Sequence, residues 1–132
     1  MSSSSIYSGD GPENAVDGNL GTQLHTLRSS SEWFKMTFSG SCRVDEIVIV
    51  NGKLNYNYVR LNNARVYVTK GDTSHILCGK ITTRRGESYE NQTYRITCSL
   101  PANHIIGVGV MVRIGSYNFL EMKEIEVFGR CS

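Results

Sequence analysis

Residues 33–52 read WFKMTFSGSCRVDEIVIVNG, and this stretch decides the class of fold. Apolar and polar side chains alternate approximately over its first six residues, which is typical of a half-buried β-strand. The next three residues, Ser39-Gly40-Ser41, predict a turn, and the β-branched run between Val44 and Val50 predicts a second strand. Asn51-Gly52 marks the end of that strand, because both residues favour turn conformations.

Strand signals recur along the rest of the chain, whereas helical periodicity persists nowhere for three turns. Gly107 and Gly109 indicate a central strand that another backbone approaches closely. We therefore expect an all-β fold, a β-sandwich of the jelly-roll type, with residues 1–132 forming a single domain. The further segments with alternating or β-branched residues, separated by Gly, Asn and Ser, are 65–69, 94–98, 105–112 and 124–128.

Composition excludes several classes of partner. The 132 residues are enough to bury a core, and the apolar fraction is 39%. No run of 18 apolar residues occurs, so we expect no membrane insertion. Lys and Arg number 14 against 12 acidic residues, and a net charge of +2 carries no signature of nucleic-acid binding.

Four cysteines allow three disulfide pairings, and the sequence alone does not choose among them. Their layout favours Cys78 with Cys98, which flank a polar, hairpin-like segment at 82–87. It also favours Cys42 with Cys131, a bond that would attach the C-terminus to the sheet. Four reduced thiols are the alternative. A zinc site is not expected, because no Cys-x-x-Cys pair occurs and the three histidines are scattered.

The cysteines also bear on location. Met1 is followed by serines and not by the basic and apolar segments of a signal peptide. We expect a secreted or extracellular domain with an added initiator Met, because disulfides persist in oxidising compartments. A cytosolic protein is the alternative.

The segment from Ser2 to Leu24 differs from the rest, because it is rich in Gly, Asn, Asp and Ser and alternates little. A loop of that length inside a domain is usually functional or tied to an ion. Asp17-Gly18-Asn19 alone indicates an ordinary turn closed by an Asx hydrogen bond.

Several motifs in this chain occur together in one family. Ser3–Gly9, Asn14–Asn19 and Trp33-Phe34 are similar to the opening of the discoidin (F5/8C) sandwich. The F-type (fucose-binding) lectins, a branch of that superfamily, add a His-Thr, an Arg-x-Asp-x4-Arg/Lys segment after Ile-x-Asn, and a Glu in the last strand. The chain resembles this branch over essentially all its residues, the matching segments being Leu24-His25-Thr26, Ile49-Val50-Asn51, Lys53-x-Asn55-x4-Arg60-Leu61 and Lys123–Val127.

The match departs from the family at defined places. Lys53 replaces the first Arg, Asn55 replaces the Asp, and the segment is one residue longer. Tyr56-Asn57 stands where the family carries a vicinal cysteine pair. Gln23 and Lys123 stand where the family carries the two cysteines of one disulfide, so both partners of that bond are replaced together. Cys78 and Cys98 match the family's other disulfide.

The resemblance implies a fucose site. A sugar needs convergent hydrogen-bond donors and one apolar wall. An imidazole donates from one nitrogen, and a guanidinium spans adjacent hydroxyls. An ammonium is a point donor on a flexible stem, so a Lys in place of the Arg loosens the geometry. Taken singly, each of these residues equally fits a solvated loop or, for the tyrosines, the core. The residues implied are the basic trio His25, Lys53 and Arg60, the orienting Asn55, and the apolar candidates Tyr56 and Tyr58.

The resemblance also implies a structural Ca²⁺ that ties the N-terminal loop and so positions His25. Calcium prefers about six to eight oxygen ligands, from carboxylates and carbonyls. Glu124, distant in sequence yet at the matching place, favours this ion over a simple turn. The residues carried over from the family are Asn14, Asp17, Asn19, Thr22, Lys123 and Glu124.

We therefore expect a lectin and not an enzyme, since no GxSxG, HExxH or P-loop occurs. The carboxylate pairs Asp45-Glu46 and Glu124-x-Glu126 lie on strands that look structural, so glycoside hydrolysis is disfavoured. The expected partners are fucosylated glycans or glycoproteins, with an oligomer or tandem repeats adding avidity. Lys53 and Asn55 leave rhamnose or galactose-type sugars open.

The alternative function is a discoidin-type module that binds a protein or a phospholipid headgroup. Such modules display apolar side chains on loops. The candidates in this chain are Leu27, Leu54, Tyr56 and Tyr58.

Overall fold

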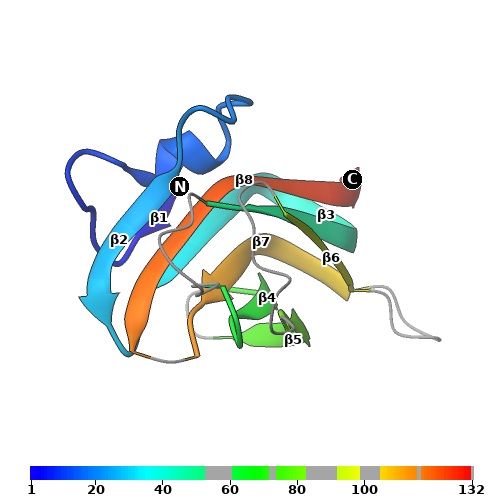
Figure 1. Cartoon of the computed structure of the whole chain (residues 1–132). Helices are drawn as coiled ribbons and strands as arrows, with labels where there is room; N and C mark the ends of the chain where they lie inside the picture. Colours follow the sequence, from blue (N-terminus) through cyan, green and yellow to red (C-terminus); the bar gives the residue numbers. More distant parts are fainter. Residues whose placement is uncertain (53–60, 72–73, 83–91, 99–104, 116, 132) are drawn as a thin grey trace.

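One long strand, β3 (Trp33–Asn51), takes part in both layers of a β-sandwich in the computed structural model of this chain (Figure 1). The structure describes residues 1–52, 61–71, 74–82, 92–98, 105–115 and 117–131. The other elements, in chain order, are β1 (Ser2–Ser3), the 3₁₀ helix η1 (Pro12–Ala15), β2 (Leu24–Ser29), β4 (Arg65–Thr69), β5 (His75–Lys80), β6 (Thr93–Thr97), β7 (Ile105–Arg113) and β8 (Asn118–Cys131). Within these ranges, no helix is long and apolar enough to cross a bilayer.

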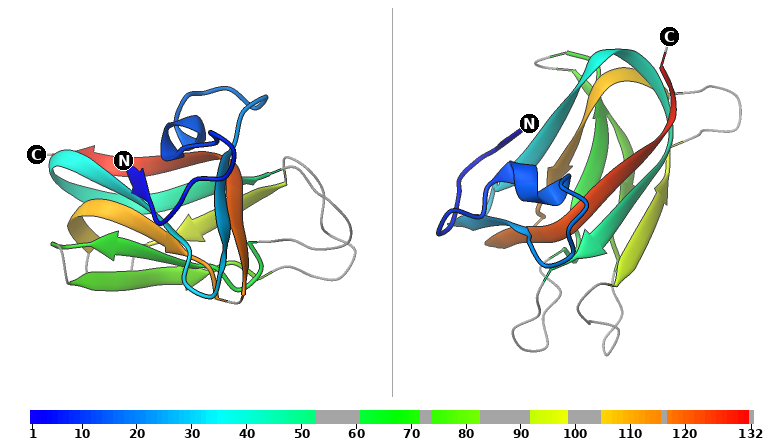
Figure 2. Two further views of the ribbon diagram at one scale, coloured as in Figure 1. Left: turned by 90° about the vertical axis from the view of Figure 1, so that its left-hand side faces the viewer. Right: turned by 90° about the horizontal axis from the view of Figure 1, so that it is seen from above.

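Strand pairing along β3 builds the two layers. Its second part pairs with β8 and β6, and β2 continues that layer beyond β8. Its first part pairs with β1 and β7, and β4 and β5 follow β7. Figure 2 shows the layers facing each other, with the N-terminal segment lying outside them. The expected antiparallel β-sandwich of the jelly-roll type is confirmed.

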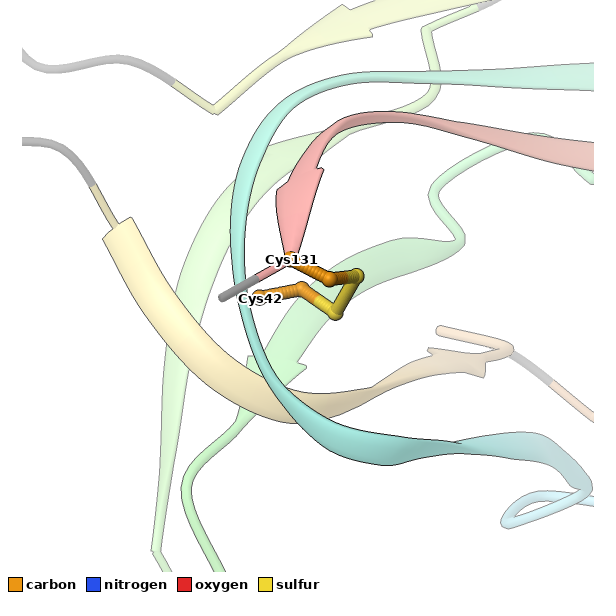
Figure 3. Close-up of a disulfide and its surroundings, with 2 residues drawn as sticks. All are labelled: Cys42 and Cys131. Atoms are coloured by element: carbon orange, nitrogen blue, oxygen red, sulfur yellow. A yellow bond between two sulfur atoms is a disulfide. The ribbon is translucent and has the colours of Figure 1, made fainter.

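The predicted turn at Ser39-Gly40-Ser41 is wrong, because β3 continues through it. The ladder to β7 shifts register here: the step from Thr37 to Cys42 on β3 spans five residues, and the facing step from Gly109 to Gly107 spans two. Surplus residues of this kind bulge and bend a strand. The bend carries β3 from one layer to the other, as its curve beside Cys42 shows in Figure 3.

Both favoured disulfides are formed, Cys42–Cys131 and Cys78–Cys98. Cys42 and Cys131 are direct partners in the β3–β8 ladder, so their bond holds the last strand against the bend of β3 (Figure 3). Cys78 lies in β5 and Cys98 directly follows β6, so the second bond joins one strand of each layer.

The core lies between the layers and follows the pleat. Phe34, Val66, Val68, Val110 and Val112 are fully buried on one side of their strands, and burial of each stabilises the fold by roughly 1.5–3 kcal/mol. The expected close approach at the glycines of β7 is confirmed. A Cβ at position 109 would lie 2.3 Å from the carbonyl oxygen of Met36.

Three strand segments were not predicted from the sequence: β2, β5 and the first half of β8. The start of β2 has three consecutive buried residues, Leu24, His25 and Thr26. Residues 120–125 of β8 are all buried. Alternation is absent in both cases because neighbouring elements cover both faces of the strand.

The N-terminal segment is more structured than the expected loop, since it contains β1 and η1. The buried Glu32 anchors it: the hydroxyls of Ser4 and Ser5 donate to one carboxylate oxygen and that of Ser29 to the other. Burial of Glu32 acts to raise its pKa, but these hydroxyl bonds outweigh it and the pKa lies below its ordinary value. The carboxylate therefore stays charged and holds three chain segments together.

The two disulfides make unequal contributions to stability. They close loops of sequence separation 89 and 20. In the chain-entropy model, removal costs about 4–5 kcal/mol for the longer loop and about 3 kcal/mol for the shorter. We expect the Cys42→Ser/Cys131→Ser variant to unfold at lower urea concentration than the Cys78→Ser/Cys98→Ser variant, measured by circular dichroism. The reverse order of the two unfolding midpoints would contradict the larger contribution assigned to the Cys42–Cys131 bond.

Candidate functional site

His25 lies on strand β2 and not on a loop, which corrects the sequence-based expectation. Its ladder partner on β8 is Glu121. The other edge of the residue is held by the N-terminal segment: His25 N–H donates to the carbonyl of Asp10, and Tyr7 N–H donates to the carbonyl of His25. The backbone under this imidazole is therefore fixed on both sides.

The imidazole of His25 is held in one orientation. Its Nδ1 is 2.8 Å from the carbonyl oxygen of Thr26, an acceptor, so Nδ1 carries the proton and donates. Nε2 lies 3.4 Å from a carboxylate oxygen of Glu121. The rings of Tyr7 and Phe119 flank the imidazole, with centroids 4.7 and 5.0 Å away. Because Nδ1 is used by the Thr26 carbonyl, Nε2 is the nitrogen that remains for a sugar hydroxyl, and the flanking aromatic rings suit the C–H faces of a sugar.

Gly52 connects this centre to the next segment of the chain. A Cβ at this position would lie 2.7 Å from Oε1 of Gln23 and 2.9 Å from Cγ of Glu121. Any larger residue would force the Gln23 and Glu121 side chains to shift. Gly52, the last described residue before 53–60, therefore lies directly beside Glu121.

Five of the predicted sugar-binding residues, Lys53, Asn55, Tyr56, Tyr58 and Arg60, lie outside the described residues. Convergence of the basic trio stays a prediction. The candidate Leu54 of the alternative function also lies outside. Leu27 is described and half-exposed, but it lies on β2 and not on a loop.

The structure adds an aromatic and cationic rim next to His25. Tyr7 is 48% exposed and Tyr117 is 63% exposed, so both present ring surface to solvent. The guanidinium of Arg28 lies 4.9 Å from the ring centroid of Tyr117 and 5.9 Å from that of Phe119. These rings offer an apolar wall at a place where sequence reasoning named only Tyr56 and Tyr58.

The structure brings together two predicted metal-site residues that are far apart in sequence. Glu124 Oε1 accepts a bond from Gly18 N–H at 2.7 Å, across 106 residues. The Asp17 carboxylate accepts from the Thr22 hydroxyl and from Asn19 N–H. The carboxyl groups of Asp17 and Glu124 also lie near enough to influence each other's pKa.

The two carboxyl groups differ in proton affinity. The Thr22 hydroxyl and the Asn19 N–H lower the pKa of Asp17. Burial raises the pKa of Glu124, and the neighbouring Asp17 raises it further. The exposed carboxyl group of Asp17 thus neighbours the buried carboxyl group of Glu124, an arrangement that a bound cation would stabilise.

The remaining metal candidates surround this pair. Asn14 donates from its side chain to the Gln23 carbonyl at 3.1 Å, and the carbonyl of Asn19 accepts from Thr22. Lys123 is buried beside Glu124 on β8. In the described part of the chain, no group of three or more His, Cys, Asp or Glu gathers as a metal site. Carbonyl oxygens would have to supply most ligands of any ion here.

Sequence reasoning missed Glu121, Tyr7 and Phe119. The buried Glu121, 3% exposed, lies three residues before the Glu124 that the motif singled out. An acidic residue in an otherwise apolar strand is a signal that could have found it. Tyr7 and Phe119 carry no such signal, because only the fold brings them to His25.

The carboxylates of Asp45 and Glu46 on β3 each form an ion pair with an arginine. Arg43 Nε lies 3.1 Å from Asp45, and Arg95 lies 2.7 Å from Glu46. Asp45 thus pairs with an arginine of its own strand and Glu46 with an arginine of β6. Both ion pairs agree with a structural role for these carboxylates.

Solved structures with the same fold include several binding proteins. A fucolectin (f-lectin) from striped bass (Morone saxatilis) serum has a TM-score of 0.83 and 23% identity, covering 98% of this chain and 45% of that one. This chain thus spans less than half the length of that lectin. A Streptococcus pneumoniae fucose-binding module follows with 0.77 and 21%, covering 98% and 89%. The family 32 carbohydrate-binding module of Clostridium perfringens NanJ, in complex with galactose, gives 0.76 and 17%, covering 96% and 90%.

The TM-scores of these structures establish the fold alone, because every identity is below 25%. The family of this chain follows from a comparison with sequence families. No curated protein matches the sequence. Residues 14–104 match the F5/F8 type C pattern described as the NedA-like, galactose-binding domain, which covers more than half of the chain. This chain therefore belongs to the family of NedA-like, galactose-binding domains of the F5/F8 type C group.

Proposed function

We propose that this domain is a non-catalytic lectin module that binds a terminal fucose, or a related sugar such as galactose or rhamnose, beside His25. The observation that carries the proposal is the fixed imidazole of His25, set between Tyr7 and Phe119 and against Glu121. Donor, acceptor and aromatic surface lie together, as a sugar site requires.

The 53–60 segment completes the proposed site. It starts at Gly52, beside Glu121, and it carries Lys53 and Arg60 of the basic trio. Similar solved structures include a fucose-binding module, a module in complex with galactose and a lectin domain in complex with the Lewis b antigen. A fucosylated glycan is therefore the first ligand to test for this chain.

Glu121 has a specific role in this proposal. Asn55 stands where the family motif carries an Asp, so the segment lacks the charge that orients its basic residues. The Glu121 carboxylate is buried next to the start of the segment. We assign to it the orienting charge that Asn55 lacks, with charge-assisted hydrogen bonds as the physical basis.

Calcium is proposed as the structural ion of the N-terminal loop. The adjacent carboxyl groups of Asp17 and Glu124 supply negative charge, and carbonyls of Asn14, Asn19, Thr22 and Lys123 are the remaining candidates. The ion would tie the loop to β8 and so steady the segment that holds His25. The two disulfides favour a secreted or extracellular location for this module.

The first test removes one member of the trio. Arg60→Ala should weaken L-fucose binding roughly 30-fold, because a hydrogen bond from a charged group contributes about 2 kcal/mol. Isothermal calorimetry gives the affinity, and thermal unfolding with and without sugar gives the stabilisation. Arg95→Ala is the matched control, since Arg95 only pairs with Glu46 on the surface. A wild-type domain that binds phosphatidylserine vesicles, and no fucose, galactose or rhamnose, would establish the alternative function.

A second test addresses Glu121. Glu121→Gln keeps an acceptor and the side-chain volume but removes the charge, so fucose affinity should fall about tenfold, which corresponds to 1.4 kcal/mol. Glu126→Gln, an exposed position on the same strand, should leave affinity unchanged. Equal affinities of the two variants in calorimetry would refute the orienting role.

A third test addresses calcium. Adding Ca²⁺ at about 100 times its Kd to chelator-treated protein should stabilise the fold by about 2.7 kcal/mol. Asp17→Asn should abolish this response, whereas Glu13→Gln, exposed in η1, should retain it. Urea unfolding with and without chelator provides the measurement. If the urea midpoint of the wild-type protein is the same with chelator and with added Ca²⁺, the proposed ion is ruled out.

A further inference from the structure

A groove of about 390 Å³ opens on the layer formed by the first part of β3, with β7, β4 and β5. It shares no lining residue with the His25 centre. The described lining residues that matter to the argument are Trp33, Lys35, Thr69, His75, Met111 and Arg113.

The strand register sets Trp33, Lys35, Met111 and Arg113 on the outer face of this layer. The intervening residues of β3 and β7, such as Phe34, are fully buried in the core, so their neighbours point outward. Trp33 lies directly opposite Arg113 and Lys35 directly opposite Met111. Side chains paired in this way are about 5 Å apart at Cβ. Trp33 therefore has Arg113 as its cross-strand neighbour and Lys35 as the next residue on the same face of β3.

Positive charge on this face is unbalanced. Among the described residues, no ion pair or hydrogen bond engages the side chains of Lys35, Arg65 or Arg113, and none of the described residues lining the groove is acidic. Arg65 is the ladder partner of Arg113 and adds a third cation. By contrast, Arg43 and Arg95 each lie against a carboxylate. Asp72, next to the lining residue Gly71, lies outside the described residues.

The backbone that carries Trp33 is anchored by hydrogen bonds of its own N–H and C=O groups. Trp33 N–H donates to the Ser4 hydroxyl at 2.9 Å, and its carbonyl accepts from Ser4 N–H at 2.9 Å. Ile114 N–H donates to the carbonyl of the preceding Glu32. On the opposite side, the His75 ring packs edge-on against Tyr67, with centroids 4.8 Å apart. A platform fixed in advance loses little entropy when a ligand binds.

We propose that this groove is a second saccharide site, selective for pyranose sugars that carry an anionic group, carboxylate or sulfate. Trp33 provides the stacking surface for the apolar face of the ring. Arg113 binds the anionic group in a bidentate manner, and Lys35 adds a point charge from the next outward-facing position of β3. The domain then holds two ligands of different chemistry on two separate surfaces.

Intrinsic fluorescence tests the proposal directly, because Trp33 is the single tryptophan of the chain. A hyaluronan tetrasaccharide supplies carboxylates, a heparin tetrasaccharide adds sulfates, and chitotetraose is the neutral control. At low ionic strength, one or both anionic probes should change the emission of the wild-type chain, and chitotetraose and L-fucose should not. The anionic probe that changes the Trp33 emission at the lower concentration shows whether the groove prefers carboxylate or sulfate.

Variants separate this site from the fucose site. Arg113→Gln should weaken binding of the active probe at least tenfold, whereas Arg95→Gln should not change it. Calorimetry with Trp33→Ala should show a similar loss, while fucose affinity stays unchanged in both groove variants. Equal responses to neutral and anionic probes, or full affinity in Arg113→Gln, would overturn the proposal whether or not fucose binds.

Discussion

The whole fold depends on the bend of β3. One continuous strand pairs with partners of both layers, and three surplus residues near Gly40 let it pass from one to the other. Because backbone hydrogen bonding continues on both sides of the bend, the layers are held at a fixed separation with the core between them. The Cys42–Cys131 bond closes the last strand onto this same point. The position of every other element follows from that strand.

The candidate sugar centre depends on the same constraint. The second part of β3 pairs with β8 and ends at Asn51, so Gly52 emerges beside Glu121. β8 in turn pairs with β2 and sets His25 opposite Glu121. The imidazole of His25, the carboxylate of Glu121 and the backbone of Gly52 therefore come from, or directly follow, three neighbouring strands of one layer. A site built on strands keeps its geometry better than one built only on loops.

The fold also gives this domain two faces with different chemistry. The end near His25 combines aromatic rings, the guanidinium of Arg28 and paired polar groups, whereas the outer face around Trp33 carries cations with no carboxylate among the described lining residues. Neither difference is visible in the net charge of +2, because acidic and basic residues balance over the chain as a whole. Charge acts locally, since water and salt screen it within about 10 Å.

Local pattern was enough to determine much of this protein. Alternation and β-branched runs determined an all-β sandwich, and the layout of the cysteines favoured both disulfides that are formed. The sites that the His-Thr and Glu motifs indicate stay predictions. These features were accessible because strand propensity and spacing involve residues close in sequence. The bend of β3, the strands β2 and β5, and the meetings of His25 with Glu121 and of Gly18 with Glu124 were decided only by the tertiary structure. They depend on register between distant strands, which one bulge can shift and which no local pattern records.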